Sequence, residues 1–363
     1  IEPQKPDTNA GCGMHPLPHF AGDFENPIGE WWINRNFARN NTVKAGNLTF
    51  TPKDERKESA LDRADRSWRS RLDSNRAEVL LSIRDAMIKL AHLTRHTRSL
   101  VWNADDGLLL WDVSRKTPEG ITCGICRSEK GREIMEQYGR TLDDLDRPLL
   151  SVRPQTEENF LSGDNFKAVL EDFSKKDIVF DRIFFRDPFT SQDGADVLAY
   201  ALDEAGTSFF SKDFSVIISQ RIPCHGQRIS DLVRNQVLAG NTGAVPDKFE
   251  CILKTMELAE NEFFGDEENP LFNWNADSVA ESFKKYGLSV KSASKVITEK
   301  RRISENEISR WFDEKNSDYG AALSSAMGNE DLDKIRNLLV TACQKTLFSW
   351  NTEILFAEVR ISD

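Results

Sequence analysis

The sequence lacks the features that mark membrane-spanning, secreted and P-loop proteins. Its 363 residues contain no apolar run of about eighteen residues, the length that a membrane-spanning helix needs. They contain no signal-peptide pattern and no GxxxxGK[ST] phosphate-binding sequence. The six cysteines are irregularly spaced, which indicates reduced thiols and not a disulfide framework. We therefore predict a cytoplasmic protein.

An excess of positive charge is also missing. Lysine and arginine together number 48, against 59 aspartates and glutamates, and the net charge is -11. This balance excludes a surface that clamps nucleic acid along its full length, although it leaves room for local basic patches. The composition, 39% hydrophobic and 29% charged, is typical of a globular protein with a sizeable core.

The chain divides into three parts by composition and periodicity. Residues 1–58 are rich in proline, glycine and asparagine, and we predict an irregular N-terminal arm. Residues 59–98 begin like a capping box and repeat apolar residues at helical spacing, which predicts a helical extension. Residues 99–363 alternate strand and helix patterns, which predicts a Rossmann-like domain with a helical insertion at about 227–286.

The third part shows five strand–helix steps in succession. Strands are expected at residues 99–103, 121–126, 149–152, 179–185 and 214–220, with helices at 108–115, 128–138, 165–173 and 193–205. Later helices are expected at 276–286, 305–312 and 331–344, and alternating strands at 288–298 and 352–361. The pattern predicts a parallel sheet whose last two strands form an antiparallel pair at one edge.

The turn within SLVWNADDGLLLWDVSR, residues 99–115, lies where nucleotide cofactors bind in doubly wound folds. Gly107 is its only glycine, and Asp105 and Asp106 stand directly before it. An aspartate here can cap the following helix by accepting its free N–H groups. It can also bind a cationic group of a ligand, and both alternatives stay open.

Four segments resemble the motifs of class I S-adenosylmethionine-dependent methyltransferases. The first motif of that family is similar to SLVWNADDGLLLW, and the second is similar to GICRSEKGREIM. The fourth motif is similar to KKDIVFDRIFFRDPF. The fifth strand and its loop are similar to FSVIISQRIPCHGQRI. The resemblance implies an α/β Rossmann-like fold with a mostly parallel seven-stranded sheet, an antiparallel C-terminal edge and S-adenosylmethionine as cofactor. It implies that Asp187 orients the methyl acceptor and that the cofactor contacts Asn103, Ala104, Asp105, Asp106, Gly107, Cys126 and Arg127.

The chain departs from that family's pattern at three places. Only the last glycine of G-x-G-x-G is present, as Gly107. Cys126 stands where a carboxylate normally binds both ribose hydroxyls, and a thiol cannot accept two such hydrogen bonds. The segment from Arg186 to Phe189 lacks the middle proline of D/N-P-P-Y/F. Two functions therefore remain: a methyltransferase, or a catalytically inactive interaction or scaffold module of the same fold.

A narrower resemblance rests on SALDRADRSW, RWF and SDYGAAL. These segments are similar to methyltransferase-like domains fused behind replication-associated recombination ATPases of the AAA+ type. The resemblance implies an AAA+ ATPase module upstream in the same polypeptide and a role in DNA replication or recombination. If the substrate is anionic, such as nucleic acid, we expect Arg221, His225 and Arg228 to contact it; the alternative is that they pack the loop.

Other site patterns are weak. Cys123 and Cys126 form C-x-x-C, but the motif is a strand's own end, which predicts two core thiols. His92 and His96 lack the glutamate of H-E-x-x-H, and no metal site is predicted. A nucleotide-binding oxidoreductase would need G-x-G-x-x-G, which the turn at Gly107 does not supply.

Overall fold

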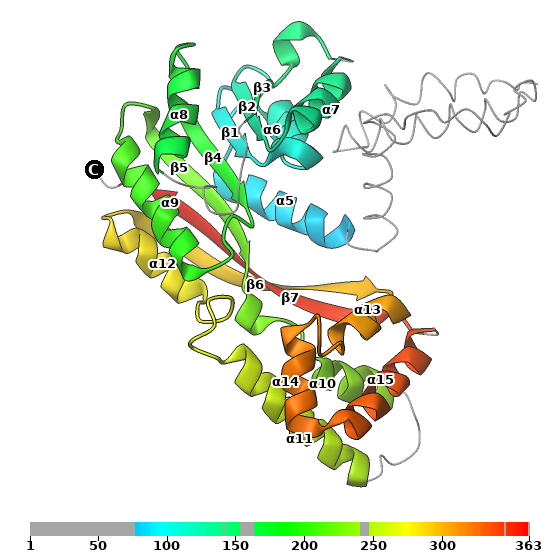
Figure 1. Ribbon diagram of the computed structural model, residues 1–363. Helices are drawn as coiled ribbons and strands as arrows, with labels where there is room; N and C mark the ends of the chain where they lie inside the picture. Colours follow the sequence, from blue (N-terminus) through cyan, green and yellow to red (C-terminus); the bar gives the residue numbers. More distant parts are fainter. Residues whose placement is uncertain (1–76, 141, 153–162, 240–246, 345, 362–363) are drawn as a thin grey trace, which may run out of the picture.

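The computed structural model describes residues 77–140, 142–152, 163–239, 247–344 and 346–361. Seven strands form one sheet in the order β3-β2-β1-β4-β5-β7-β6 (Figure 1). Pairing is parallel from β3 to β5 and antiparallel on both sides of β7. The strands are β1 (Arg98–Trp102), β2 (Ile121–Cys126), β3 (Leu149–Val152), β4 (Phe180–Arg186), β5 (Phe210–Arg221), β6 (Ser289–Arg301) and β7 (Phe348–Arg360).

The strand–helix alternation and the late antiparallel pair are thus confirmed. The inner strands are short apolar runs because helices cover both faces of the sheet. Leu100 and Trp102 point to one face, while Val101 points to the other, and all three are buried.

Two layers of helices cover the sheet (Figure 1). One layer packs on Leu100, Trp102, Phe180 and Phe185, and its helices are α8 (Gly163–Ser174), α9 (Gln192–Ala205) and α12 (Ala276–Lys285). The other packs on Val101 and Phe184, and its helices are α5 (Ala77–Ala91), α6 (Leu110–Lys116) and α7 (Glu129–Gly139).

A separate helical lobe lies at the far end of β6 and β7 (Figure 1). Its core joins segments from both sides of β6, and Leu253, Leu323 and Leu339 are fully buried in it. The lobe comprises α10 (Ile229–Leu232), a π-helix (Val233–Leu238), α11 (Asp247–Phe264), α13 (Glu305–Trp311), α14 (Asp318–Met327) and α15 (Asn329–Cys343).

Two glutamines join the lobe to β7 where β5 no longer runs beside it. The Gln236 side chain donates to the Ser349 carbonyl at 2.7 Å and accepts the Ser349 N–H at 2.6 Å. The Gln227 side chain accepts the Asn351 N–H at 3.0 Å. These amides satisfy the backbone groups that an additional strand would otherwise pair.

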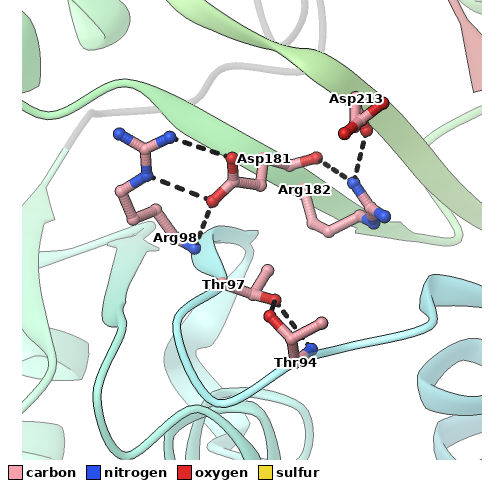
Figure 2. A network of polar contacts seen from close by, with 6 residues as sticks. All are labelled: Thr94, Thr97, Arg98, Asp181, Arg182 and Asp213. Atoms are coloured by element: carbon pink, nitrogen blue, oxygen red, sulfur yellow. Dashed lines mark hydrogen bonds and ion pairs between the residues drawn. The ribbon is translucent and has the colours of Figure 1, made fainter.

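Polar contacts fix the amino-terminal edge of the sheet, opposite the candidate site (Figure 2). Arg98 at the start of β1 donates to the Asp181 carboxylate of β4 from its backbone N–H at 2.7 Å and from Nη2 at 2.9 Å. Arg182 donates to the carbonyls of Ala91 at 2.7 Å and Asp213 at 2.6 Å. Guanidinium groups therefore tie the starts of β1, β4 and β5 to the end of α5.

The N-terminal arm lies outside the described residues, and so does the helical extension up to residue 76. The domain boundaries remain predictions. No helix in the described ranges is long and apolar enough to cross a membrane.

A buried charge cluster joins α5 to α6. The Asp112 carboxylate is 2.7 Å from the Arg84 guanidinium and 2.5 Å from that of Arg115. The side chains of Asp112 and Arg84 are only 2% and 6% exposed. Burial raises the pKa of Asp112 to about 6, even though both arginines oppose the shift.

This raised pKa predicts a pH-dependent contribution to stability. The unfolded chain releases the Asp112 proton near pH 3.8, whereas the folded chain keeps it until about pH 6. The contribution of Asp112 therefore falls by about 3 kcal/mol as the pH rises from 4 to 7. Urea unfolding of the wild type and Asp112→Asn at several pH values measures the difference. A difference that stays constant or grows with pH contradicts the expected effect.

Candidate functional site

A cleft of about 990 Å³ opens at the carboxyl ends of the strands. Its lining runs from the loop after β1, past the ends of β4 and β5, to the end of β6 and the first residues of β7. Ligands of doubly wound sheets bind at this edge, where adjacent loops diverge. The lining includes Asn103, Asp105, Asp106, Arg127, Arg186, Asp187, Arg221, Trp350 and Glu353.

The turn after β1 is a single 3-10 turn between two left-handed residues. Asn103 has φ 63° and Gly107 has φ 67°. Asparagine and glycine tolerate this backbone conformation better than other residues. The turn directs the side chains of Asp105 and Asp106 to the cleft, while Ala104 is buried beneath them.

Neither aspartate caps the helix that follows. Helix α6 has Leu109 at its N-cap position, without a side-chain hydrogen bond. Of the two alternatives, capping of α6 by an aspartate is therefore not found; Asp106 accepts the N–H of Leu108, which precedes the helix.

Asp105 docks instead on the loop after β2. Its two carboxylate oxygens accept the Arg127 N–H at 3.0 and 2.9 Å. A side chain on Gly131 would overlap Asp105 Oδ1, so the glycine makes room for the carboxylate at the start of α7. Burial raises the pKa of Asp105, and the hydrogen bond from Arg127 opposes the shift.

Asp106 forms an ion pair with Arg186, the last residue of β4. The side chains are 13% and 18% exposed, and Asp106 Oδ1 also accepts the Leu108 N–H at 3.0 Å. Burial alone would lower the pKa of Arg186, but the Asp106 carboxylate outweighs it and holds that pKa above its usual value. This ion pair connects the loop after β1 to the end of β4.

The thiols at β2 are core groups, as predicted from the C-x-x-C spacing. Cys123 and Cys126 are fully buried and lie in the cores on opposite faces of the sheet. Burial raises the pKa of each thiol to about 12. A neutral, buried thiol at Cys126 does not replace a ribose-binding carboxylate.

Asp187 follows β4 at a fixed and uncommon backbone conformation. It has φ 48°, and its N–H donates to the Ser219 carbonyl at 2.7 Å. Its carboxylate accepts the backbone N–H of Arg221 at 3.0 Å and Arg221 Nε at 3.1 Å. Positive φ at a residue other than glycine is strained and occurs often at functional sites.

The aromatic residue of this segment is not exposed to the cleft as a stacking surface. Phe189 is 4% exposed and packs with Phe283 of α12. The Gln220 side chain accepts the Phe189 N–H at 2.9 Å and donates to its carbonyl at 3.2 Å. A planar acceptor cannot stack on Phe189 in this arrangement.

The three basic residues after β5 lie in different surroundings. Arg221 pairs with Asp187, and His225 Nδ1 is 3.0 Å from the Glu353 carboxylate. The Arg228 guanidinium stacks 3.9 Å above the Phe264 ring and donates to two nearby carbonyls. Arg228 thus packs the loop against α11.

The cleft brings together Asn103, Asp105, Asp106, Arg127, Asp187 and Arg221. Of the other residues predicted from sequence, Ala104, Gly107, Cys126, His225 and Arg228 do not line it. Arg186 was missed, although its charge directly after a buried apolar strand is a signal that could have found it. The roles of all these residues remain predictions.

The strand order, with β7 antiparallel, gives the chain the Rossmann-like fold of class I methyltransferases. No protein-family profile and no curated protein sequence matches the chain. Three of the solved structures that match the chain are at most 15% identical to it. Precorrin-6y C5,15-methyltransferase from Geobacter metallireducens is 8% identical, with 77% of this chain and 86% of that chain covered and a TM-score of 0.35. A cyclopropane-fatty-acyl-phospholipid synthase-like protein from Lactobacillus casei is 10% identical, with 78% and 90% covered and a TM-score of 0.39. Coclaurine N-methyltransferase bound to N-methylheliamine and SAH is 15% identical, with 77% and 70% covered and a TM-score of 0.36.

The close fit of Asp105 against α7 predicts a coupled pair of substitutions. Gly131→Ala is expected to destabilise the fold by about 1–3 kcal/mol, because the new methyl group overlaps the Asp105 carboxylate. Asp105→Gly in the same chain is expected to recover most of that loss. Urea unfolding of both single variants and the double variant measures the coupling.

The matched control is Gly139→Ala in the same helix. A methyl group there meets its nearest atom, on Trp111, at 3.4 Å, so a much smaller effect is expected. Additive losses from Gly131→Ala and Asp105→Gly would contradict the contact.

Proposed function

We propose that this chain is an S-adenosylmethionine-dependent methyltransferase. The observation that carries the proposal is the cleft at the carboxyl ends of β1, β4 and β5, lined by the residues after each of these strands. The motif resemblance supplies the cofactor class. When bound, the cofactor provides an electrophilic methyl group.

The residues present fit the amino-acid end of this cofactor. Asp106 and Arg186 offer one carboxylate and one guanidinium side by side, which complements an ammonium and a carboxylate. Asn103 and Arg127 line the adjoining part of the cleft and would lie beside the ribose, where Cys126 offers no acceptor. The cofactor is therefore held by charged side chains more than by a glycine-rich loop.

Asp187 is positioned to orient the acceptor. Its backbone is fixed by Ser219, and its carboxylate lines the cleft at the end of β4. An acceptor N–H or O–H that donates to this carboxylate is held in one direction and gains nucleophilicity as the proton is drawn away.

A specific observation favours the second candidate, a catalytically inactive interaction module. Asp105 and Asp106 already satisfy Arg127, Leu108 and Arg186, so the chain's own side chains occupy part of the cofactor corner. A carboxylate at this corner also repels the carboxylate of an incoming ligand.

Isothermal titration with S-adenosylmethionine and its demethylated product decides between the two. We expect saturable heat, and about tenfold weaker binding for Asp106→Asn because one charged partner is lost. Asp143→Asn is the control, since Asp143 is an exposed acid before β3 that does not line the cleft. An absence of heat at millimolar ligand overturns the enzyme and leaves the interaction module.

We propose further that the domain works with an AAA+ ATPase module upstream in the same polypeptide, in DNA replication or recombination. The segments SALDRADRSW, RWF and SDYGAAL support this proposal by resemblance. The coding sequence upstream of Ile1 tests it: a Walker A motif is expected there, and its absence contradicts the fusion.

A further inference from the structure

Two contacts beside the cleft share one arrangement, in which a carboxylate holds a nitrogen-bearing side chain from the inner side. Arg221 Nε lies 3.1 Å from Asp187, and His225 Nδ1 lies 3.0 Å from Glu353. Arg221 is 62% exposed against 28% for Asp187, and His225 is 52% exposed against 22% for Glu353. In both pairs the arginine or histidine side chain is therefore more exposed to solvent than the carboxylate.

In each pair, the nitrogens of Arg221 or His225 that do not contact the carboxylate remain available to a ligand. Within the described part of the chain, the Arg221 guanidinium donates to Asp187 through Nε, and Nη1 and Nη2 have no hydrogen-bond partner. His225 likewise meets Glu353 through Nδ1, which leaves Nε2 open there. A guanidinium held at Nε presents the other two nitrogens as a rigid fork.

The side chains of Arg221 and His225 extend from one short segment of backbone. Arg221 is paired with Ile354 of β7, next to Glu353. The Ile222 N–H donates to the Glu353 carbonyl at 3.2 Å, and a 3-10 turn at Pro223–His225 follows directly. The two side chains thus leave one short turn that is anchored to two consecutive residues of β7.

The other arginines near the cleft are not arranged this way. Arg186 is 18% exposed and paired with Asp106, and Arg228 is stacked on Phe264. Arg301 is 9% exposed, pairs with Glu307 and stacks on Trp350. Arg127 is exposed like Arg221, but its Nε donates to the Asn103 side-chain amide oxygen at 3.3 Å and not to a carboxylate. Arg221 is thus the exposed arginine of the cleft lining whose Nε is held by a carboxylate.

We propose that Arg221 and His225 form a binding site for a phosphate group of the acceptor, with Asp187 and Glu353 as positioning residues. The guanidinium fork matches two phosphate oxygens, and the protonated form of the His225 imidazole donates a third hydrogen bond from Nε2. In a protein of net charge -11, an exposed guanidinium favours the approach of a phosphate at this place. That the phosphate belongs to a methyl acceptor rests on the proposed function, but binding of the phosphate does not require the cofactor.

Two phosphate probes test the site without any cofactor in the sample. Inorganic pyrophosphate is titrated calorimetrically, and a fluorescent single-stranded oligonucleotide is followed by anisotropy at low salt. We expect at least one probe to bind, and Arg221→Gln to weaken that probe about 10- to 100-fold. Binding of pyrophosphate alone identifies a small phosphorylated acceptor, and binding of the oligonucleotide alone identifies a nucleic acid.

Three further variants make the test specific. Arg221→Lys keeps the charge but not the fork, and is expected to bind nearly as weakly as Arg221→Gln. His225→Gln is expected to weaken binding several-fold. Arg95→Gln is the matched control, because Arg95 is also exposed and paired with a carboxylate, Glu119, but precedes β1 at the other edge of the sheet.

Thermal unfolding of every variant confirms that it is folded before binding is compared. The proposal is overturned if neither probe binds at millimolar concentration, if Arg221→Lys binds like the wild type, or if Arg95→Gln weakens binding as much as Arg221→Gln. Because no cofactor is present, these outcomes are independent of the titration with S-adenosylmethionine.

Discussion

A row of contacts between carboxylates and hydrogen-bond donors holds the carboxyl edge of the sheet together. It crosses the sheet from the end of β2, through β1, β4 and β5, to β7. The contacts are Asp105 with the Arg127 N–H, Asp106 with Arg186, Asp187 with Arg221 and Glu353 with His225. These contacts position the loops after β1, β2, β4 and β5.

The contacts differ in strength because they differ in burial. Exposed pairs such as Arg221 with Asp187 contribute about 0–1 kcal/mol each, since water competes for both charges. Separating Asp106 from Arg186 costs more, because each would lose its partner while mostly buried. A ligand that separates Asp106 from Arg186 must therefore offer a positive group to Asp106 and a negative group to Arg186. A ligand that binds Arg221 can leave its contact with Asp187 in place.

The sequence was sufficient to predict most of the fold because its signals are local. β2 and β3 begin and end at the residues expected from their apolar runs. Helix α14 was missed, because GAALSSAM offers small residues and no strong apolar period. Its burial depends mainly on α11, which lies far from it in the sequence.

The candidate site was only partly predictable for the same reason. A motif identifies the loop at Asp105 and Asp106, but the partners of these residues are set by tertiary structure. Arg186 comes 80 residues after Asp106, and no spacing rule connects them. The role of Gly131 was equally hidden, since its importance is the space that it leaves for a carboxylate from another loop.

The continuity of β6 and β7 determines how the two halves of the molecule depend on each other. Their antiparallel ladder runs unbroken from Ser289 opposite Arg360 to Arg301 opposite Phe348. One end of this ribbon belongs to the sheet, and Phe348 at the other end is buried in the core of the helical lobe. A strand cannot shift its register at one end alone, because every side chain along it would change faces. The continuous ribbon of β6 and β7 therefore fixes the distance between the sheet and the helical lobe.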